Sequence, residues 1–267
     1  MKQKSNLHTH TTFSDGRGTV EETVSAAMER GFVSLGISDH SYDEYGADYS
    51  LARGSEREYC RTVREARDKY SGKIDIFCGI ELDSMSVTPD VDLDYVIASV
   101  HSLSLDGWAY PVDLSPEGQR KMIDTYFGGD RLGFAERYFE SVVRHTEKTK
   151  PDIVGHFDLI TKYSLIDEDD PAYRRLAVEA IRECAKYCRR FEVNTGAMAR
   201  GLRTSPYPAD FLLSELLKLS CSVVITSDAH YPEKIDFAFD ETAAYLKRLG
   251  FTAVQRLTAN GFVDDVL

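Results

Sequence analysis

Six of the seven histidines in this chain stand where a short apolar segment ends, and this placement constrains the fold more than any other feature. Imidazole is a common ligand of transition metals, and ligands need rigid supports that bring them to one point. Short apolar runs are typical of buried strands, so the pattern predicts strand ends that gather around metal ions. The six are His8, His10, His40, His101, His156 and His230.

Seven short apolar segments alternate with helical patterns, which indicates an α/β architecture with a parallel sheet. The expected strands are 5–8, 34–38, 75–80, 95–100, 153–155, 191–194 and 223–226. The expected helices include one that opens with a capping box at Thr19 and Glu22 and stops at Gly31. The others are 55–70, 131–149, 171–189, 208–219 and 236–249. We expect loops around Pro89 and over 108–116.

Seven strands are one short of the number in a (β/α) barrel. We therefore expect a distorted, seven-stranded, TIM-like barrel that forms a single domain over residues 1–267. Functional residues of such barrels lie at the C-terminal ends of the strands, and the candidate ligands take that place on every strand except the sixth. The remaining histidine, His145, falls in the charged segment RYFESVVRHTEKTK, and we expect it to be an exposed helix residue.

The bulk composition narrows the class of protein. A formal net charge of −12 disfavours a broad surface for nucleic acid, although it permits a local basic pocket. No segment approaches the length of a membrane span, and the N-terminus MKQKSNLHTH has no apolar core of a signal peptide. The five cysteines form no CxxC pair, and core packing suits Cys184 and Cys188 better than metal ligation. We expect a cytoplasmic protein without disulfides.

The spacing of the candidate ligands supports a shared metal site. His8 and His10 are two residues apart, so they point the same way on an extended segment, and Asp228 and His230 repeat this spacing. Glu81 ends the third expected strand. Each feature alone fits a structural role better than a metal site, for example a satisfied core histidine or a turn. Their joint occurrence at successive strand ends favours a metal centre.

The whole set resembles the PHP family, the polymerase and histidinol phosphatase superfamily. The residues that carry the resemblance are HTH at 8–10, Asp15, DH at 39–40, Glu81, SVH at 99–101, GH at 155–156 and SDAH at 227–230. The resemblance implies a distorted seven-stranded barrel and three divalent metal ions, which could be zinc, manganese or iron. Some members of the family have histidine where this chain has Asp15, a difference that could alter the metal preference of the third site.

The resemblance also implies how the ligands are shared. His8, His10, Glu81 and Asp228 would hold the first ion. Glu81, His101 and His156 would hold the second, with Glu81 as the bridge. Asp15, His40 and His230 would hold the third. Asp15, Glu81, Asp228 and His230 are expected to be the catalytic residues.

The implied chemistry is hydrolysis of a phosphoester by a hydroxide that bridges two metal ions. The segments GHFDLITKY at 155–163 and NTGAMARG at 194–201 resemble the histidinol-phosphate phosphatase branch, so the expected substrate is L-histidinol phosphate, a small molecule of histidine biosynthesis. Lys162, Arg200 and Arg203 are the candidate phosphate-binding residues, although an exposed base would explain each of them as well. The sequence does not select the group that protonates the leaving alcohol.

Three other functions remain open from the sequence. The same centre could act on nucleotides or another small ester, as a phosphatase or an exonuclease. A degenerate site would give a metal-binding protein without catalysis, but no expected ligand is missing. An amidohydrolase usually has a lysine as the bridging ligand, and here the bridging position is expected to be Glu81.

Overall fold

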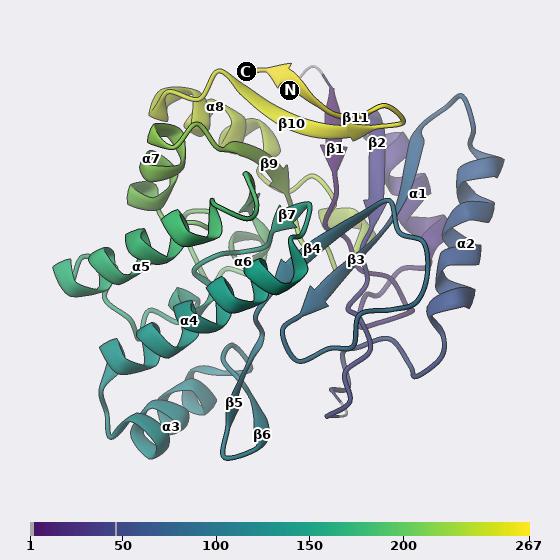
Figure 1. Cartoon of the computed structure of the whole chain (residues 1–267). Helices are drawn as coiled ribbons and strands as arrows, with labels where there is room; N and C mark the ends of the chain where they lie inside the picture. The colour runs from purple at the N-terminus through teal and green to yellow at the C-terminus, as the bar shows by residue number, and fades with distance from the viewer. Residues whose placement is uncertain (1–2, 46) are drawn as a thin grey trace.

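The computed structural model describes residues 3–45 and 47–267, and its centre is a seven-stranded parallel sheet rolled into a nearly closed barrel (Figure 1). The spatial order of the strands follows their order in the chain. They are β1 (Lys4–Asn6), β2 (Phe32–Ile37), β3 (Asp75–Asp83), β4 (Tyr95–Ser99), β7 (Ile153–Val154), β8 (Arg190–Asn194) and β9 (Ser222–Thr226). The predicted α/β barrel is confirmed, with each strand close to its expected position.

The barrel closes between its first and last strands, just beyond their C-terminal ends. The backbone N–H of His10 donates to the carbonyl of Ala229 at 3.0 Å, and the N–H of Ala229 donates to the carbonyl of His8 at 3.3 Å. Below this closure, the side-chain amide of Asn6 donates to the Ser227 hydroxyl at 2.7 Å. The segments that carry four candidate ligands are thus held side by side.

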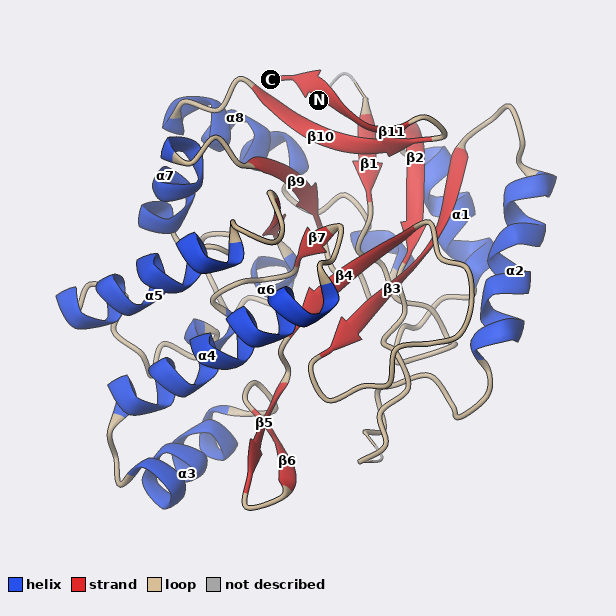
Figure 2. Cartoon of the chain, viewed as in Figure 1, coloured by secondary structure: helices blue, strands red, loops and turns tan. Residues whose placement is uncertain are grey.

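Helices surround the barrel (Figure 2). They are α1 (Val20–Glu29), α2 (Glu56–Lys69), α3 (Pro116–Phe127), α4 (Arg131–Thr149), α5 (Pro171–Cys184), α6 (Gly196–Ala199), α7 (Asp210–Lys218) and α8 (Phe239–Leu249), with the 3₁₀ turns η1 (Leu159–Thr161) and η2 (Pro232–Lys234). The predicted capping box opens α1, because the Thr19 hydroxyl accepts from the N–H of Glu22 at 3.2 Å and the Glu22 carboxylate accepts from the N–H of Thr19 at 2.8 Å. Among the described helices, none combines the length and the apolar character that crossing a bilayer requires.

Two hairpins add to the barrel, and the sequence analysis expected neither. β5 (Ser102–Leu105) and β6 (Trp108–Pro111) pair antiparallel, so the loop expected over 108–116 is wrong for its first part. Their turn is Asp106-Gly107, both with positive φ, a pair typical of two-residue hairpins. β10 (Ala253–Thr258) and β11 (Gly261–Val266) form the second hairpin.

The β10–β11 hairpin lies across the N-terminal end of the barrel (Figure 1). Leu257 of β10 belongs to the apolar cluster that fills this end, and Phe262 of β11 packs against that cluster. The other members are Leu7, Phe77, Tyr95, Ile97, Ile153 and Val224. The end opposite the histidines is therefore closed by apolar packing.

His145 corrects an expectation. It lies on α4 as predicted, but it is only 7% exposed, and its Nε2 lies 2.8 Å from the Leu82 carbonyl of β3. The inner face of α4 is apolar and packs on the barrel, and a neutral imidazole that donates to a backbone carbonyl can be buried there. The charged neighbours of His145 concealed this inner position.

Tyr95 determines which residues neighbouring strands can carry. Its buried ring crosses the barrel interior, and its hydroxyl donates to the Leu7 carbonyl at 2.5 Å. A Cβ at Gly36 of β2 would lie 2.0 Å from the Tyr95 hydroxyl oxygen, and a Cβ at Gly79 of β3 would lie 2.2 Å from its Cζ. These glycines leave the space that the tyrosine occupies.

We expect Gly79→Ala to lower the free energy of unfolding by about 1–3 kcal/mol, because the added methyl group would overlap a buried ring. Urea denaturation measures this loss. The same substitution in a Tyr95→Leu background should cost clearly less, since the obstructing ring is gone. An equal cost in both backgrounds would show that the Tyr95 ring is not the constraint.

Candidate metal centre

The structure gathers all the predicted metal ligands at the C-terminal end of the barrel. They reach it from the strand ends and the segments that follow, and the imidazoles of His8, His10 and His156 are almost fully buried. The gathered residues are His8, His10, Asp15, His40, Glu81, His101, His156, Asp228 and His230.

Glu81 lies at the middle of this cluster, on β3. One carboxylate oxygen, Oε2, is 3.1 Å from His8 Nε2 and 2.9 Å from His40 Nδ1. The other, Oε1, is 2.9 Å from His156 Nε2 and 3.4 Å from His101 Nε2. A carboxylate with imidazoles on both oxygens has the geometry of a ligand that bridges two ions.

The ligand atoms form three overlapping groups in which all atoms lie within 4.8 Å of one another. The groups are His8, His10 and Glu81; His40, Glu81 and His101; and His10, Asp15, His40 and His230. Asp228 adjoins the first group, with Oδ1 at 3.2 Å from His10 Nε2. His10 and His40 each belong to two groups. The structure therefore does not divide these histidines between separate ions as clearly as the resemblance implied.

Buried polar atoms that make no hydrogen bond indicate that the cluster suits metal ions. Among the described residues, several buried atoms of the site have no hydrogen-bond partner, a condition that usually costs free energy. They include His8 Nε2, both ring nitrogens of His10, Asp15 Oδ1, His40 Nδ1 and Glu81 Oε2. Divalent cations would satisfy these atoms, and this mixture of nitrogen and oxygen donors fits zinc, manganese or iron.

The charge states of the site also suit cation binding. Burial and the neighbouring imidazoles of His230 and His40 lower the pKa of His10 to about 3, so His10 is neutral at pH 7 and its lone pair is available. Burial alone would raise the pKa of Glu81, but the imidazoles of His8, His101 and His40 hold it well below its usual range. Glu81 is therefore ionised, as a metal ligand would need to be.

Glu192 of β8 is a residue of the site that sequence reasoning missed. Its Oε1 lies 2.5 Å from His8 Nδ1 and accepts from the Thr226 hydroxyl at 2.6 Å, while its Oε2 accepts from the N–H of His156 at 2.7 Å. This contact turns His8 Nε2 toward Glu81, the usual arrangement of a carboxylate behind a metal-binding histidine. The signal was present, because a glutamate inside a buried strand needs a partner.

Two further carboxylates orient predicted ligands or the loop between them. The Asp83 Oδ2 accepts from the N–H of His101 at 2.6 Å and lies 3.1 Å from its Nδ1, so Nε2 faces Glu81. Asp39 accepts from the N–H and hydroxyl of Thr11, at 2.7 and 2.8 Å, and from the Ser14 hydroxyl at 2.5 Å. Asp39 thereby fixes the loop between His10 and Asp15.

A cavity of about 310 Å³ opens beside the cluster and receives two of the three predicted phosphate-binding residues. Arg200 follows α6, and its Nη2 is 3.1 Å from Asp228 Oδ2. Lys162 follows η1, and its Nζ is 2.7 Å from the carboxylate of Asp113, a lining residue that the sequence analysis did not select. Tyr49 and Leu114 also line this cavity.

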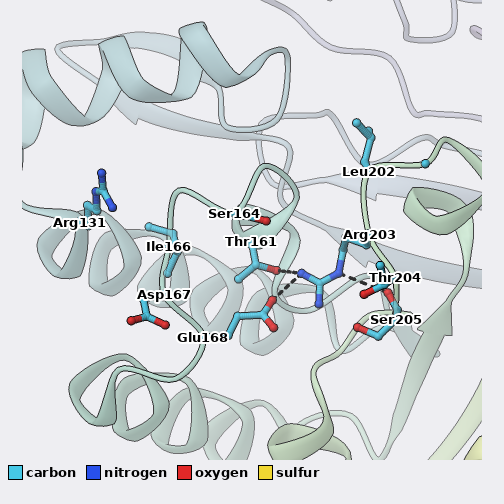
Figure 3. Close-up of a pocket in the computed structure, with 11 residues that line it drawn as sticks. Arg131, Thr161, Ser164, Ile166, Asp167, Glu168, Leu202, Arg203, Thr204 and Ser205 are labelled. Atoms are coloured by element: carbon cyan, nitrogen blue, oxygen red, sulfur yellow. Dashed lines mark hydrogen bonds and ion pairs between the residues drawn. The ribbon is translucent and has the colours of Figure 1, made fainter.

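The third residue, Arg203, does not line this cavity. It lines a separate cavity of about 480 Å³ and is directed at Thr161 and Glu168 (Figure 3). Its guanidinium also lies 4.7 Å from the centre of the Tyr207 ring, and its side chain is only 7% exposed. These contacts place Arg203 outside the cavity beside the cluster, and its role in phosphate binding stays a prediction.

Known proteins resemble the chain over most of its length. A probable histidinol-phosphatase from Schizosaccharomyces pombe is 24% identical over 261 residues, which cover 89% of this chain and 83% of that protein. One from Deinococcus radiodurans is 26% identical and covers 91% and 92%. The solved structure of histidinol phosphate phosphatase from Lactococcus lactis, complexed with zinc, L-histidinol and phosphate, has the same fold, with a TM-score of 0.72, 20% identity and coverage of 98% and 99%. Residues 6–196 match the model of the PHP domain, so the chain belongs to the PHP domain family, as its resemblance predicted.

Proposed function

We propose that this protein is a metal-dependent phosphomonoesterase that hydrolyses L-histidinol phosphate to L-histidinol and inorganic phosphate. The observation that carries the proposal is the set of three overlapping ligand groups around Glu81, next to a cavity lined by Arg200 and Lys162. The names of its relatives support the substrate. We propose that residues 1–267 act as one phosphoesterase domain.

Three divalent ions would be held by the gathered ligands. Glu81 would bridge one ion near His8, His10 and Asp228 and a second ion near His101 and His156. Asp15, His40 and His230 would hold the third ion. Bound ions would lower the pKa of a coordinated water and neutralise charge on phosphate oxygens. Zinc is supported by the Lactococcus lactis complex, whereas the donor set also accepts manganese or iron. Asp15, Glu81, Asp228 and His230 are the proposed catalytic residues.

Arg200 and Lys162 would bind the phosphate oxygens. Arginine can bind two oxygens at once, and lysine adds a point charge. Asp228 holds the Arg200 guanidinium and Asp113 holds the Lys162 ammonium, so both cations are oriented before substrate arrives. We leave Arg203 out of this set.

The rest of the cavity suits a small alcohol. Tyr49, Pro111 and Leu114 line it with apolar surface, and its volume of about 310 Å³ fits a compact ester better than a polymer. The net charge of −12 likewise argues against nucleic acid as substrate. We also propose a cytoplasmic location, because all five cysteines are buried free thiols, a state that persists in reducing compartments.

The direct test is release of inorganic phosphate from L-histidinol phosphate after chelation and reloading with zinc or manganese. We expect turnover only with metal, and kcat/KM far higher than for p-nitrophenyl phosphate or nucleoside monophosphates. Equal or better turnover of those esters would support a metal-dependent phosphoesterase but would show that L-histidinol phosphate is not its preferred substrate. If the protein binds stoichiometric metal but hydrolyses none of these esters, the proposed phosphatase activity is wrong.

Glu192→Gln should weaken metal retention by about 10- to 100-fold, because it removes the negative charge behind His8. Metal content after dialysis against a weak chelator measures the effect. Glu81→Ala should lose metal and activity more severely, by about 10³-fold in kcat/KM. Glu179→Gln, on the exposed face of α5, is the matched control. Normal metal content in Glu192→Gln would contradict the orienting role.

Arg200→Ala should raise KM by about 10- to 100-fold, because a charge-assisted hydrogen bond to phosphate is lost in the ground state and the transition state alike. Steady-state kinetics at full metal occupancy measures this. Arg200→Lys should recover part of the loss, and Arg175→Ala, exposed on α5, should leave KM unchanged. An unchanged KM in Arg200→Ala would return this arginine to a structural role.

A further inference from the structure

The cavity lined by Arg200 and Lys162 is called the substrate cavity below. A second cavity of about 310 Å³ adjoins it at the cluster of predicted metal ligands. Both cavities are lined by Asp15, Arg200, Asp228 and His230, which form their common boundary. Their remaining linings differ. Whereas Lys162 and Tyr49 line the substrate cavity, Arg17 and Lys234 line the second one.

The second cavity brings together three cationic side chains from separate parts of the chain. Arg17 comes from the loop after β1, Arg200 follows α6, and Lys234 ends η2. The backbone N–H of Arg17 donates to the His230 carbonyl at 2.7 Å, so the position of Arg17 is tied to a proposed metal ligand. This hydrogen bond fixes the backbone of Arg17 beside the cavity, whereas the side chains of Arg17 and Lys234 are exposed.

Two of these cations have no counter-ion within the described part of the chain. No ion pair involves Arg17 or Lys234, and the ammonium of Lys234 lies 5.5 Å from the centre of the Phe237 ring. The guanidinium of Arg200 is shared with Asp228, at 3.1 Å.

The acidic residues that line this cavity belong to the metal cluster. Asp15 lies 3.1 Å from His230 Nε2 through its Oδ2, and Asp228 lies 3.2 Å from His10 Nε2 through its Oδ1. Metal ions held as proposed above would offset both carboxylates. The charge left facing the cavity would then be positive, and its lining would favour a small, highly charged anion.

We propose that this cavity is a second phosphate-binding subsite, distinct from the position of the phosphate that is hydrolysed. Its ligand is a phosphate group, bound by Arg17, Lys234 and Arg200. The group could be inorganic phosphate from solution or the second phosphoryl group of a bisphosphorylated small alcohol. The inference rests on the metal occupancy of the proposed function, because without metal the two carboxylates oppose an anion.

Equilibrium dialysis of metal-loaded protein against radiolabelled inorganic phosphate tests the subsite. The wild-type protein should bind two phosphates per chain, and the double variant Arg17→Ala/Lys234→Ala should bind one. The control is Lys121→Ala/Arg175→Ala, which removes the same charge from exposed positions on α3 and α5 and should bind two. Metal content is measured in each sample, so that a loss of metal is not mistaken for a loss of the subsite.

Binding of one phosphate by wild type and double variant alike would overturn the subsite and leave the proposed function intact. Loss of the second phosphate in the control pair would also overturn it, because net charge alone would then explain binding. If the proposed function itself is wrong, the metal-loaded wild-type protein shows no metal-dependent binding of phosphate and hydrolyses no ester.

Kinetics separates the two sources of phosphate. If the subsite receives a second phosphoryl group, the Arg17→Ala/Lys234→Ala variant should raise KM at least tenfold for a bisphosphorylated small alcohol and leave KM for a monophosphate unchanged. If it receives inorganic phosphate alone, both KM values stay unchanged and only the second binding event disappears. Either result supports the subsite, whereas an equal rise in both KM values would place these cations in general phosphate binding and overturn it.

Discussion

The buried carboxylate of Glu81 is the constraint on which the rest of the site depends. An ionised group in a barrel interior is costly unless opposite charges or hydrogen-bond donors surround it. Here histidines from several strand ends surround it at distances of 2.9–3.5 Å. Glu192 fixes the imidazole of His8 and Asp83 fixes that of His101, while Asp39 holds the loop that follows His10, so the arrangement extends outward from one side chain. The barrel provides the strand ends that make such a convergence possible.

The two ends of the barrel have opposite characters. Leu257 and its apolar neighbours close the N-terminal end, and the metal cluster, with its polar atoms, occupies the C-terminal end. Tyr95 lies between them, with its ring among the apolar residues and its hydroxyl on the Leu7 carbonyl. The apolar end supplies rigidity through packing, and the polar end carries the chemistry.

The strands and the ligands could be predicted from the sequence because they depend on local patterns. An apolar run that ends in histidine or aspartate is visible without any knowledge of the partners. What the sequence did not reveal depends on tertiary contacts. Glu192 is visible as a charge in a buried strand, but its partner His8 is not. His145 looked solvated beside charged neighbours, and Arg203 gave no sign of its pairing with Glu168. The hairpin at Asp106-Gly107 had a local signal, but the surrounding loop-like residues obscured it.

The closure between β1 and β9 joins residues that are far apart in the chain. Asn6 and Ser227 meet across 221 residues, and His8, His10, Asp228 and His230 stand directly beyond them. Among the described residues, the backbone pairing between these two segments is limited to a bridge at Thr9 and Ala229, beyond the ends of the two strands. Ions held jointly by the two segments would act as a non-covalent clasp on this ring. Chelation would then separate β1 from β9 first, while the continuous pairing between β3 and β4 remains. The metal centre would therefore keep the barrel closed in addition to carrying its chemistry.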